Sequence, residues 1–330
     1  MLQLKNNTPF AASMMLSPDE HAIDTLYITI KATFDVGVSL RLSDVQIPPQ
    51  ESDLYWGEPG ESSLKYGSDH HLGKPCTDIV MVGDAHAPKG MTVTRLDVAL
   101  QVAELRKSVR VFGDRYWHEG QMSAPEPFVM MPMVYERAFG GVYAKDGVTV
   151  SEDVRNPVGR GYAEKSEASA INGMLLPNLE NPTELIECYL DKPTPACFGF
   201  CAPHWHPRAS YAGSYDSVWK RERAPYLPDD FDKRFFNMAH PDLIYPEFLQ
   251  GGEAVKITHM HPEGGLQFEV PTVRFAVVAD VGGILKEAVM NMETLILEPN
   301  ILQMSMVWKG AVPCDKKTLK IGSVKINILR

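Results

Sequence analysis

The sequence predicts a mainly β protein with a few short helices. Its sandwich-like core is expected to come from strands at both ends of the chain, wrapped by a long loop-rich middle segment. Residues alternate between apolar and polar near both ends, which is the pattern of strands with two different faces. From about 120 to 250, proline and glycine recur every few residues and interrupt any long periodicity. We therefore expect a single domain over residues 1–330, with a loop-rich lobe at about 120–250.

The first strands are expected at 27–34 and 78–83. In "YITIKATF" (27–34), Ile28, Ile30, Ala32 and Phe34 share one face, and polar residues occupy most of the other. This alternation predicts a half-buried strand. The apolar run "DIVMVG" (78–83) predicts a short, fully buried strand that ends at a glycine.

Two hairpins are expected, one in each half of the chain. The first joins "TRLDVALQV" (94–102) to "SVRVFG" (108–113) through a turn at 103–107. The second joins "TLILE" (294–298) to "ILQMSMVW" (301–308) through Pro299 and Asn300, which favour a turn. In each hairpin one strand shows a clear apolar face, with Leu96, Val98, Leu100 and Val102 in the first and Leu302, Met304, Met306 and Trp308 in the second.

The middle segment contains one clear helix signal. In "NPTELIECYL" (181–190), Asn181 can act as N-cap, Pro182 fits the first helical position and Glu184 completes a capping box. Shorter helical turns are expected at 216–223 and 229–236. The segment is also rich in aromatic residues, unlike a disordered linker, so we expect it to pack on the rest of the protein.

Composition excludes several classes of partner. The formal net charge is −10, the pI is about 5.5, and no block of lysine and arginine stands out, so nucleic acid is not an expected partner. No stretch of about 18 apolar residues and no signal peptide is present, so we expect a cytoplasmic protein that does not bind membranes. The five cysteines are odd in number and scattered, and we expect them to be reduced.

The segment "RNPVGRGY" (155–162) lacks the lysine of a phosphate-binding loop and the third glycine of a dinucleotide-binding loop. We interpret it as architecture, in which Asn156 starts a turn and Arg155 and Arg160 brace neighbouring loops. The expected acceptors for the arginines are carboxylates in 133–141, 214–219 or 229–235.

The strongest metal-like pattern is "CFGFCAPHWH", which brings together Cys197, Cys201, His204 and His206. These are zinc-type ligands, but structural zinc sites separate the two ligand pairs by a dozen or more residues. A second pair, His259 and His261, is followed directly by a proline. We therefore expect no metal, no cofactor and no catalytic residue. The alternative is an enzyme, either a metal-dependent hydrolase that uses the four histidines or a cysteine-based transferase.

Ten ordered motifs indicate a family resemblance. The chain resembles a bacterial family of domains of unknown function found in type VI secretion gene clusters, whose characterised members act as effector adaptors, also called chaperones. Its motif before Trp205 departs from the family pattern at Cys197 and Phe200. The matching stretches are "NNTPF" (6–10), "IKATF" (30–34), "SDHHLGKPCTDIVMVGDAHAP" (68–88), "RVFGDRYW" (110–117), "MPMVYERAFGG" (131–141), "RNPVGRGY" (155–162), "LPNLENP" (176–182), "WHPRASYAGSYDSVW" (205–219), "LPDDFDKRFFNMAHPDL" (227–243) and "GGEAV" (251–255).

The resemblance implies a protein that binds a secreted effector, stabilises it and helps to load it onto the spike-tip proteins of the secretion tube. It assigns no catalytic or ligand-binding residue. The middle segment holds aromatic and arginine side chains, which dominate the energetics of protein interfaces. From this composition we expect the partner-binding residues to be Trp205, Arg208, Tyr211, Tyr215 and Trp219.

Overall fold

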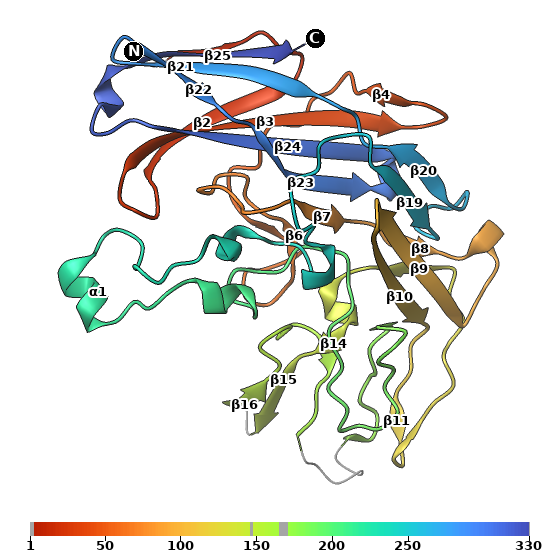
Figure 1. The fold of residues 1–330 in the computed structure, drawn as a ribbon. Helices are drawn as coiled ribbons and strands as arrows, with labels where there is room; N and C mark the ends of the chain where they lie inside the picture. The colour runs from red at the N-terminus through yellow and green to blue at the C-terminus, as the bar shows by residue number, and fades with distance from the viewer. Residues whose placement is uncertain (1–2, 146–147, 165–170, 330) are drawn as a thin grey trace.

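The largest sheet of the computed structural model joins the two ends of the chain (Figure 1). The structure describes residues 3–145, 148–164 and 171–329. Strand β3 pairs with β24 over eleven consecutive residues, from Thr25 opposite Pro313 to Asp35 opposite Gln303. In order across the sheet, the strands are β2 (Ala11–Pro18), β3 (Asp24–Val36), β24 (Gln303–Pro313), β23 (Asn291–Glu298) and β7 (Asp78–Met81), with β4 (Leu40–Leu42) added to β3.

A second sheet packs on one face of the first. Its aromatic contacts with the large sheet centre on Phe275 of β21, whose ring centroid lies 5.1 Å from that of Trp308 in β24 and 6.0 Å from that of Phe10. The two sheets thus share an aromatic layer, and both contain strands from the ends of the chain. The strands in order are β1 (Gln3–Asn6), β25 (Ile321–Leu329), β21 (Arg274–Val281) and β22 (Ile284–Ala288).

A third sheet contains the first predicted hairpin. Its strands in order are β18 (Leu179–Glu180), β10 (Leu105–Phe112), β9 (Arg95–Val102), β19 (Ala254–Thr258) and β20 (Leu266–Glu269). The turn is tighter than expected, since Val102 already pairs with Leu105 and only Ala103 and Glu104 lie between them. The predicted inward face of β9 is confirmed, because Leu96, Val98, Leu100 and Val102 are all buried.

The remaining elements are short, which confirms the prediction of a mainly β protein with a few short helices. Among the described residues, five pairs of strands lie outside the three sheets: β5 (Leu54–Tyr55) with β6 (Leu64–Tyr66), β8 (Asp84–His86) with β13 (Met130–Pro132), β11 (Trp117–His118) with β12 (Gln121–Met122), β14 (Phe139–Gly140) with β17 (Arg160–Gly161), and β15 (Val142–Lys145) with β16 (Val148–Glu152). The helical elements are α1 (Ser217–Glu222) and the 3₁₀ turns η1 (Pro88–Gly90), η2 (Tyr135–Arg137), η4 (Arg208–Tyr211), η5 (Lys233–Phe236), η6 (Pro241–Leu243), η7 (Pro299–Ile301) and η8 (Thr318–Lys320).

The second predicted hairpin is formed by β23 and β24, with η7 as its turn. The structure also confirms that β7 is fully buried, and places it parallel to β23 at the edge of the large sheet. The helical turn predicted at 216–223 corresponds to α1, and that at 229–236 contains η5.

The prediction that the strand at 27–34 is half-buried is wrong. All residues from Thr25 to Phe34 in β3 are buried, on both faces. Its polar face is covered by the segment 46–78, where the Asp69 carboxylate accepts a 3.3 Å bond from Lys31 Nζ. Gln46 bonds to both backbone groups of Thr33 at 2.9 Å. The polar residues therefore pair with protein groups instead of water.

The predicted helix at 181–190 is absent, and the segment is a series of turns. Asn181 Oδ1 accepts from the Thr183 amide at 3.1 Å, as an N-cap would, but no helix follows. Carboxylates take the amides that a helix would pair with its own carbonyls. Glu180 accepts from the Ile186 amide at 2.9 Å, and Asp191 accepts from Glu187 and Cys188, each at 2.8 Å.

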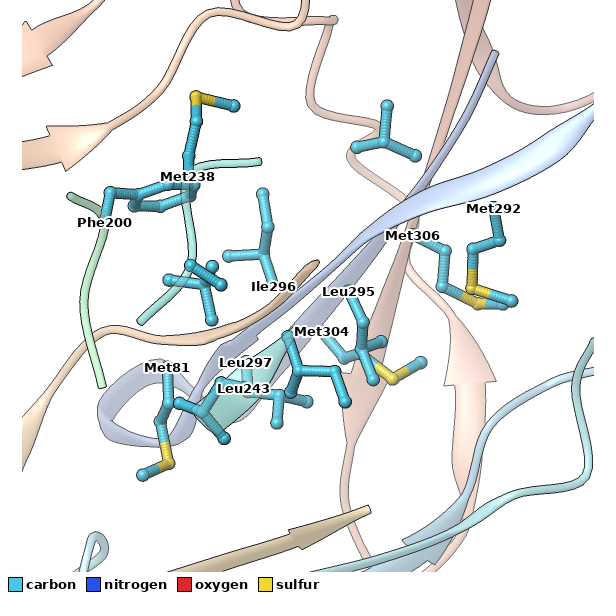
Figure 2. Packing of buried hydrophobic residues seen from close by; sticks show 14 of the residues in the cluster. Met81, Phe200, Met238, Leu243, Met292, Leu295, Ile296, Leu297, Met304 and Met306 are labelled. Atoms are coloured by element: carbon cyan, nitrogen blue, oxygen red, sulfur yellow. The ribbon is translucent and has the colours of Figure 1, made fainter. Parts of the chain in front are cut away.

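Residues from the middle segment complete the core, so this segment does pack on the sheets. Figure 2 shows Phe200 and Met238 on the same side of the strands as Ile296 of β23, with Met292 and Met306 across the strand ribbons from them. At Gly67 a Cβ would lie 2.2 Å from the sulfur of Met238, so a larger residue there would force the methionine side chain to move. A smaller second cluster lies apart from this core and consists of Trp117, Phe139, Ala163, Ile171, Leu176 and Ile186.

The helical elements are too short to cross a bilayer. Among the residues that the structure describes, none forms a helix that is both long and apolar enough for a membrane span.

Candidate protein-interaction site

The loop at 155–162 is braced by the three residues that the sequence indicated. Asn156 is fully buried, and its Nδ2 donates to the carbonyls of Tyr135 and Phe139 at 2.8 and 2.9 Å. Arg155 forms a two-pronged contact with Asp153, at 2.9 Å from Nε and 2.5 Å from Nη2. The partner of Arg155 thus lies two residues away and outside the three segments that we expected.

Arg160 also braces a neighbouring turn, but through a backbone carbonyl instead of a carboxylate. Its Nε donates to the carbonyl of Glu136 at 3.0 Å, which lies in one of the expected segments. The glycines of this region allow the close approach of the backbone. At Gly140, where φ is 145°, a Cβ would lie 2.1 Å from the carbonyl oxygen of Asn156. The loop is therefore a packed structural unit.

Two of the five predicted partner-binding residues are buried, which corrects our expectation that they form a surface. Trp205 has no exposed area, and its ring lies edge-on to Tyr135 with 5.1 Å between centroids. Arg208 is 7% exposed, and its guanidinium donates to the carbonyls of Cys201 and Phe235 at 2.5 and 2.9 Å. Both side chains hold the core together instead of facing a partner.

Cys197, Cys201 and His204 each contact a different partner. Cys197 Sγ donates to the Met133 carbonyl at 3.3 Å, and the Cys201 sulfur lies 3.1 Å from the Tyr135 hydroxyl. Burial raises the pKa of the Cys197 thiol to about 12 and that of Cys201 to about 11, which keeps both protonated and unreactive at neutral pH. His204 Nε2 accepts from the indole of Trp205 at 3.0 Å.

His259 lies just after β19, where its Nδ1 is 2.9 Å from the Asp97 carbonyl. Within the described ranges, no three residues among histidine, cysteine, aspartate and glutamate gather as metal ligands would. Burial also raises the pKa of the Cys76 thiol.

The other three predicted residues belong to a projecting arm, which we define as residues 211–234. Figure 1 shows α1 at the outer end of this excursion, well away from the three sheets. Asp216 caps α1, because its Oδ1 accepts from the amides of Val218 and Trp219 at 2.9 and 2.8 Å. Asp230 joins the outgoing and returning chains by accepting from the amide and hydroxyl of Ser214, at 2.9 and 2.7 Å.

Trp219 is the internal support of the arm. Its indole nitrogen donates to the carbonyl of Tyr226 at 2.8 Å, and its ring meets that of Tyr215 edge-on with 4.8 Å between centroids. The bond to Tyr226 closes the loop that follows α1, and the contact with Tyr215 ties α1 to the chain that leads into it. Trp219 is half-buried as a result, whereas Tyr215 remains 53% exposed.

The arm is fixed to the loop between β2 and β3 at two points, near its base through Lys233 and directly after α1 through Arg223. Lys233 Nζ lies 2.6 Å from the Glu20 carboxylate, and Arg223 Nη2 donates to the Glu20 carbonyl at 2.7 Å. Arg223 Nε also donates to the Leu227 carbonyl at 2.9 Å. Tyr211 and Arg234 lie at the base of the arm, where the Arg234 guanidinium is 4.3 Å above the Tyr211 ring. These contacts orient the arm relative to the large sheet.

The arm presents an apolar surface that the sequence identified in part. Around Trp219 it exposes Tyr215, Val218 and Tyr226, with Val218 48% and Tyr226 41% exposed. Val218 lies inside the predicted helical turn at 216–223, directly before Trp219, so its position in the sequence could have identified it. Tyr226 comes from the returning chain, and only the tertiary fold brings it here. We call Tyr215, Val218, Trp219 and Tyr226 the arm surface.

The chemistry of the arm surface suits recognition of another protein. Large aromatic groups supply contact area with few rotatable bonds, and a pre-ordered loop loses little entropy on binding. The surrounding side chains are polar, as at the rim of an interface. Lys220, Arg221 and Glu222 are all exposed on α1.

Comparison with protein-family models gives one match. The model described as "Uncharacterized protein conserved in bacteria (DUF2169)" matches residues 21–309, which covers most of the chain and the whole arm. Neither a curated protein nor a solved structure matches the chain.

Proposed function

The chain belongs to the bacterial DUF2169 family, and from this premise we propose that it is an adaptor for a secreted effector of a type VI secretion system. In this proposal it acts in the cytoplasm, binds the effector, stabilises it and helps to load it onto the spike-tip proteins. The observation that carries the proposal is the arm, which exposes aromatic and aliphatic groups at a distance from the three sheets.

The position of the recognised motifs supports this proposal. The stretches 205–219 and 227–243 form the two sides of the arm and continue into its buried base, where Trp205 and Arg208 lie. The same region thus contains buried residues that fix it to the core and the exposed arm surface. This arrangement suits a recognition element, because an arm surface that is already ordered loses little entropy on binding.

The arm surface would be the centre of the effector interface. A stable interface buries at least about 1,000 Å² in total. The four side chains of the arm surface are too few for this area, so adjoining surfaces of the body must also contribute. Truncation of a central aromatic residue of an interface commonly costs 2 kcal/mol or more, which corresponds to an affinity about 30-fold weaker.

The proposal is tested by co-expressing the chain with each candidate effector encoded beside its gene and purifying any complex. We expect one stable complex, and we expect Tyr215→Ala and Val218→Asp to weaken it at least tenfold without lowering the melting temperature. Arg221→Ala, a change at an exposed α1 residue outside the arm surface, serves as the matched control.

The same strains test the cellular role. Deletion of the adaptor gene should reduce both the abundance and the secretion of the effector, and the wild-type gene should restore them. Normal effector abundance and secretion in the deletion strain, together with no complex from any pair, would overturn the proposal.

A further inference from the structure

An open cleft of about 720 Å³ lies on the body of the protein, apart from the arm surface. It is bounded by the β5–β6 hairpin, the ends of β7 and β23, and the turns η2 and η7. Its volume is in the range of known ligand sites. Most of its wall is apolar and comes from Trp56, Tyr66, Val82, Pro132, Val134 and Ile301.

The acidic side chains of the cleft already have hydrogen bonds within the protein. Glu136 accepts from the amide and hydroxyl of Ser63, at 2.6 and 2.7 Å, so both of its oxygens are occupied. Glu298 accepts from the hydroxyl of Tyr66. The Asp84 carboxylate accepts from the side-chain Nδ2 of Asn300 at 2.6 Å. These carboxylates thus hold the walls of the cleft together.

The basic side chains, in contrast, have unused donors. The guanidinium of Arg160 donates to the protein only through Nε, and neither of its Nη groups has a partner among the described residues. Lys65 Nζ lies 4.6 Å from the ring centroid of Trp56, and in the described part of the chain no carboxylate lies within 4 Å of it. Arg137 Nη1 donates to Asn178 at 3.0 Å and lies 3.6 Å from Asp114.

The two arginines also repel each other. Burial and the positive charge of Arg137 lower the pKa of Arg160, and the nearby Asp114 and Glu136 only partly oppose this shift. An additional anion next to Arg160 would relieve the repulsion and occupy its free donors. Guanidinium groups bind carboxylates well, because two parallel N–H donors match the two oxygens.

We propose that this cleft binds a segment of a partner protein in which an acidic residue adjoins a large apolar residue. The carboxylate would lie at Arg160 and Lys65, and the apolar side chain would pack against Trp56, Val134 and Ile301. The inference does not depend on the proposed function, since such a site would exist in a protein with any role.

The shape of the cleft favours a peptide over a small acid. Small-molecule sites bury most of their ligand. Here Trp56 is 46% and Ile301 58% exposed, so the wall continues onto the open surface. A peptide can enter with one side chain and leave its backbone outside.

The experiment uses the full-length chain and a library of random twelve-residue peptides displayed on phage. We expect the selected peptides to share an aspartate or glutamate beside an aromatic or large aliphatic residue. The affinity of a synthetic copy of one selected peptide is then measured by fluorescence anisotropy. We expect it to weaken as salt is added, because part of the attraction is between exposed charges.

Two exposed or half-buried positions provide the variants, so that folding is preserved. Lys65→Gln removes one cation, and Ile301→Asp places a charge on the apolar wall. Each should weaken the peptide at least tenfold, whereas Arg221→Gln on the arm should leave the affinity within twofold. The melting temperature of each variant serves as the check on folding.

The proposal is overturned if no peptide is selected, if the selected peptides lack an acidic residue, or if both variants bind as well as the wild type. Displacement of the bound peptide by an equal concentration of free N-acetylaspartate would also overturn the proposal, because the apolar wall would then contribute nothing to the affinity. Loss of this site would leave effector binding by the arm intact, so the two proposals fail separately.

Discussion

The ammonium group of Lys74 lies 2.6 Å from the carboxylate of Asp78, and neither side chain has any exposed area. Lys74 Nζ also donates to the hydroxyl of Thr294 at 2.7 Å. The Asp78 carboxylate accepts from the amide of Met238 and from Nδ2 of Asn237, at 2.7 and 2.8 Å. This one ion pair therefore connects β7, β23 and the start of the chain that follows the arm.

Replacing Lys74 by methionine should destabilise the protein strongly. The substitution keeps the length of the side chain but leaves the Asp78 carboxylate buried without its cation, which costs about 3 to 5 kcal/mol. Urea unfolding gives the change in the free energy of unfolding. The control is Arg221→Met, because the Arg221 and Glu222 side chains are 69% and 61% exposed and such pairs contribute about 0 to 1 kcal/mol. Equal losses in the two variants would contradict the prediction.

The pH dependence of stability should carry a contribution from Glu293. Burial raises the pKa of this side chain from 4.5 to about 7, although Lys309 and Lys74 partly oppose the shift. The folded protein therefore binds the proton more tightly than the unfolded chain. The stabilisation is complete below pH 4.5 and is lost as the pH rises to about 7.

Glu293→Gln tests this contribution, because glutamine stays neutral at every pH. The free energy of unfolding of the variant, relative to the wild type, should rise between pH 4.5 and 7 and stay constant below 4.5. The difference between the two proteins is used because other groups also titrate in this range. One of them is His71, whose pKa is lowered by burial and whose Nδ1 lies 3.8 Å from the Glu293 carboxylate. A flat difference across this range would show that Glu293 titrates normally.

Asn156→Ala should also destabilise the protein. The change removes the donor to the carbonyls of Tyr135 and Phe139, both of which lie within the core. A buried acceptor without a partner costs about 1 to 3 kcal/mol. Asn181→Ala is the control, because the side-chain hydrogen bonds of Asn181, with Thr183 and Glu184, lie in an exposed turn. Thermal unfolding should show a clear loss for Asn156→Ala and a small one for Asn181→Ala.

The features that sequence reasoning predicted are those fixed by neighbours in the chain. The β9–β10 hairpin follows from alternation on either side of a turn, and the short helix α1 lies within the helical turn predicted at 216–223. The polar face of β3 could not be predicted in this way. Lys31 looks solvent-exposed in the sequence, but its partner Asp69 is 38 residues away, and only the fold brings the two together.

The helix at 181–190 failed for a related reason. Its capping signals are real, since Asn181 accepts from the Thr183 amide. The backbone amides that follow donate to the carboxylates of Glu180 and Asp191. These contacts are more favourable than the weak intrinsic preference of the segment for a helix.

Residue type alone also could not separate buried anchors from surface groups in the candidate site. Trp205 and Trp219 have the same chemistry and lie in one motif, yet only the first is fully buried. Partner binding by Tyr211, Tyr215 and Trp219 stays a prediction.

The rigidity of the arm should depend on the cap of α1. Asp216→Ala removes the acceptor for the amides of Val218 and Trp219, and the loss of such a cap costs about 0.5 to 2 kcal/mol. Since the arm stands apart from the sheets, the effect should be local opening instead of global unfolding. Hydrogen exchange in α1 should become up to about 30-fold faster, and the melting temperature should change little.

Ser217→Ala is the matched control, because this exposed neighbour has no side-chain hydrogen bond among the described residues. If the arm binds an effector, Asp216→Ala should also weaken that complex, since the binding free energy must then include the cost of ordering the arm again. Exchange in α1 that is already as fast as in an unfolded peptide would show that the wild-type arm is not pre-ordered. That result would remove the structural basis for placing the effector interface there.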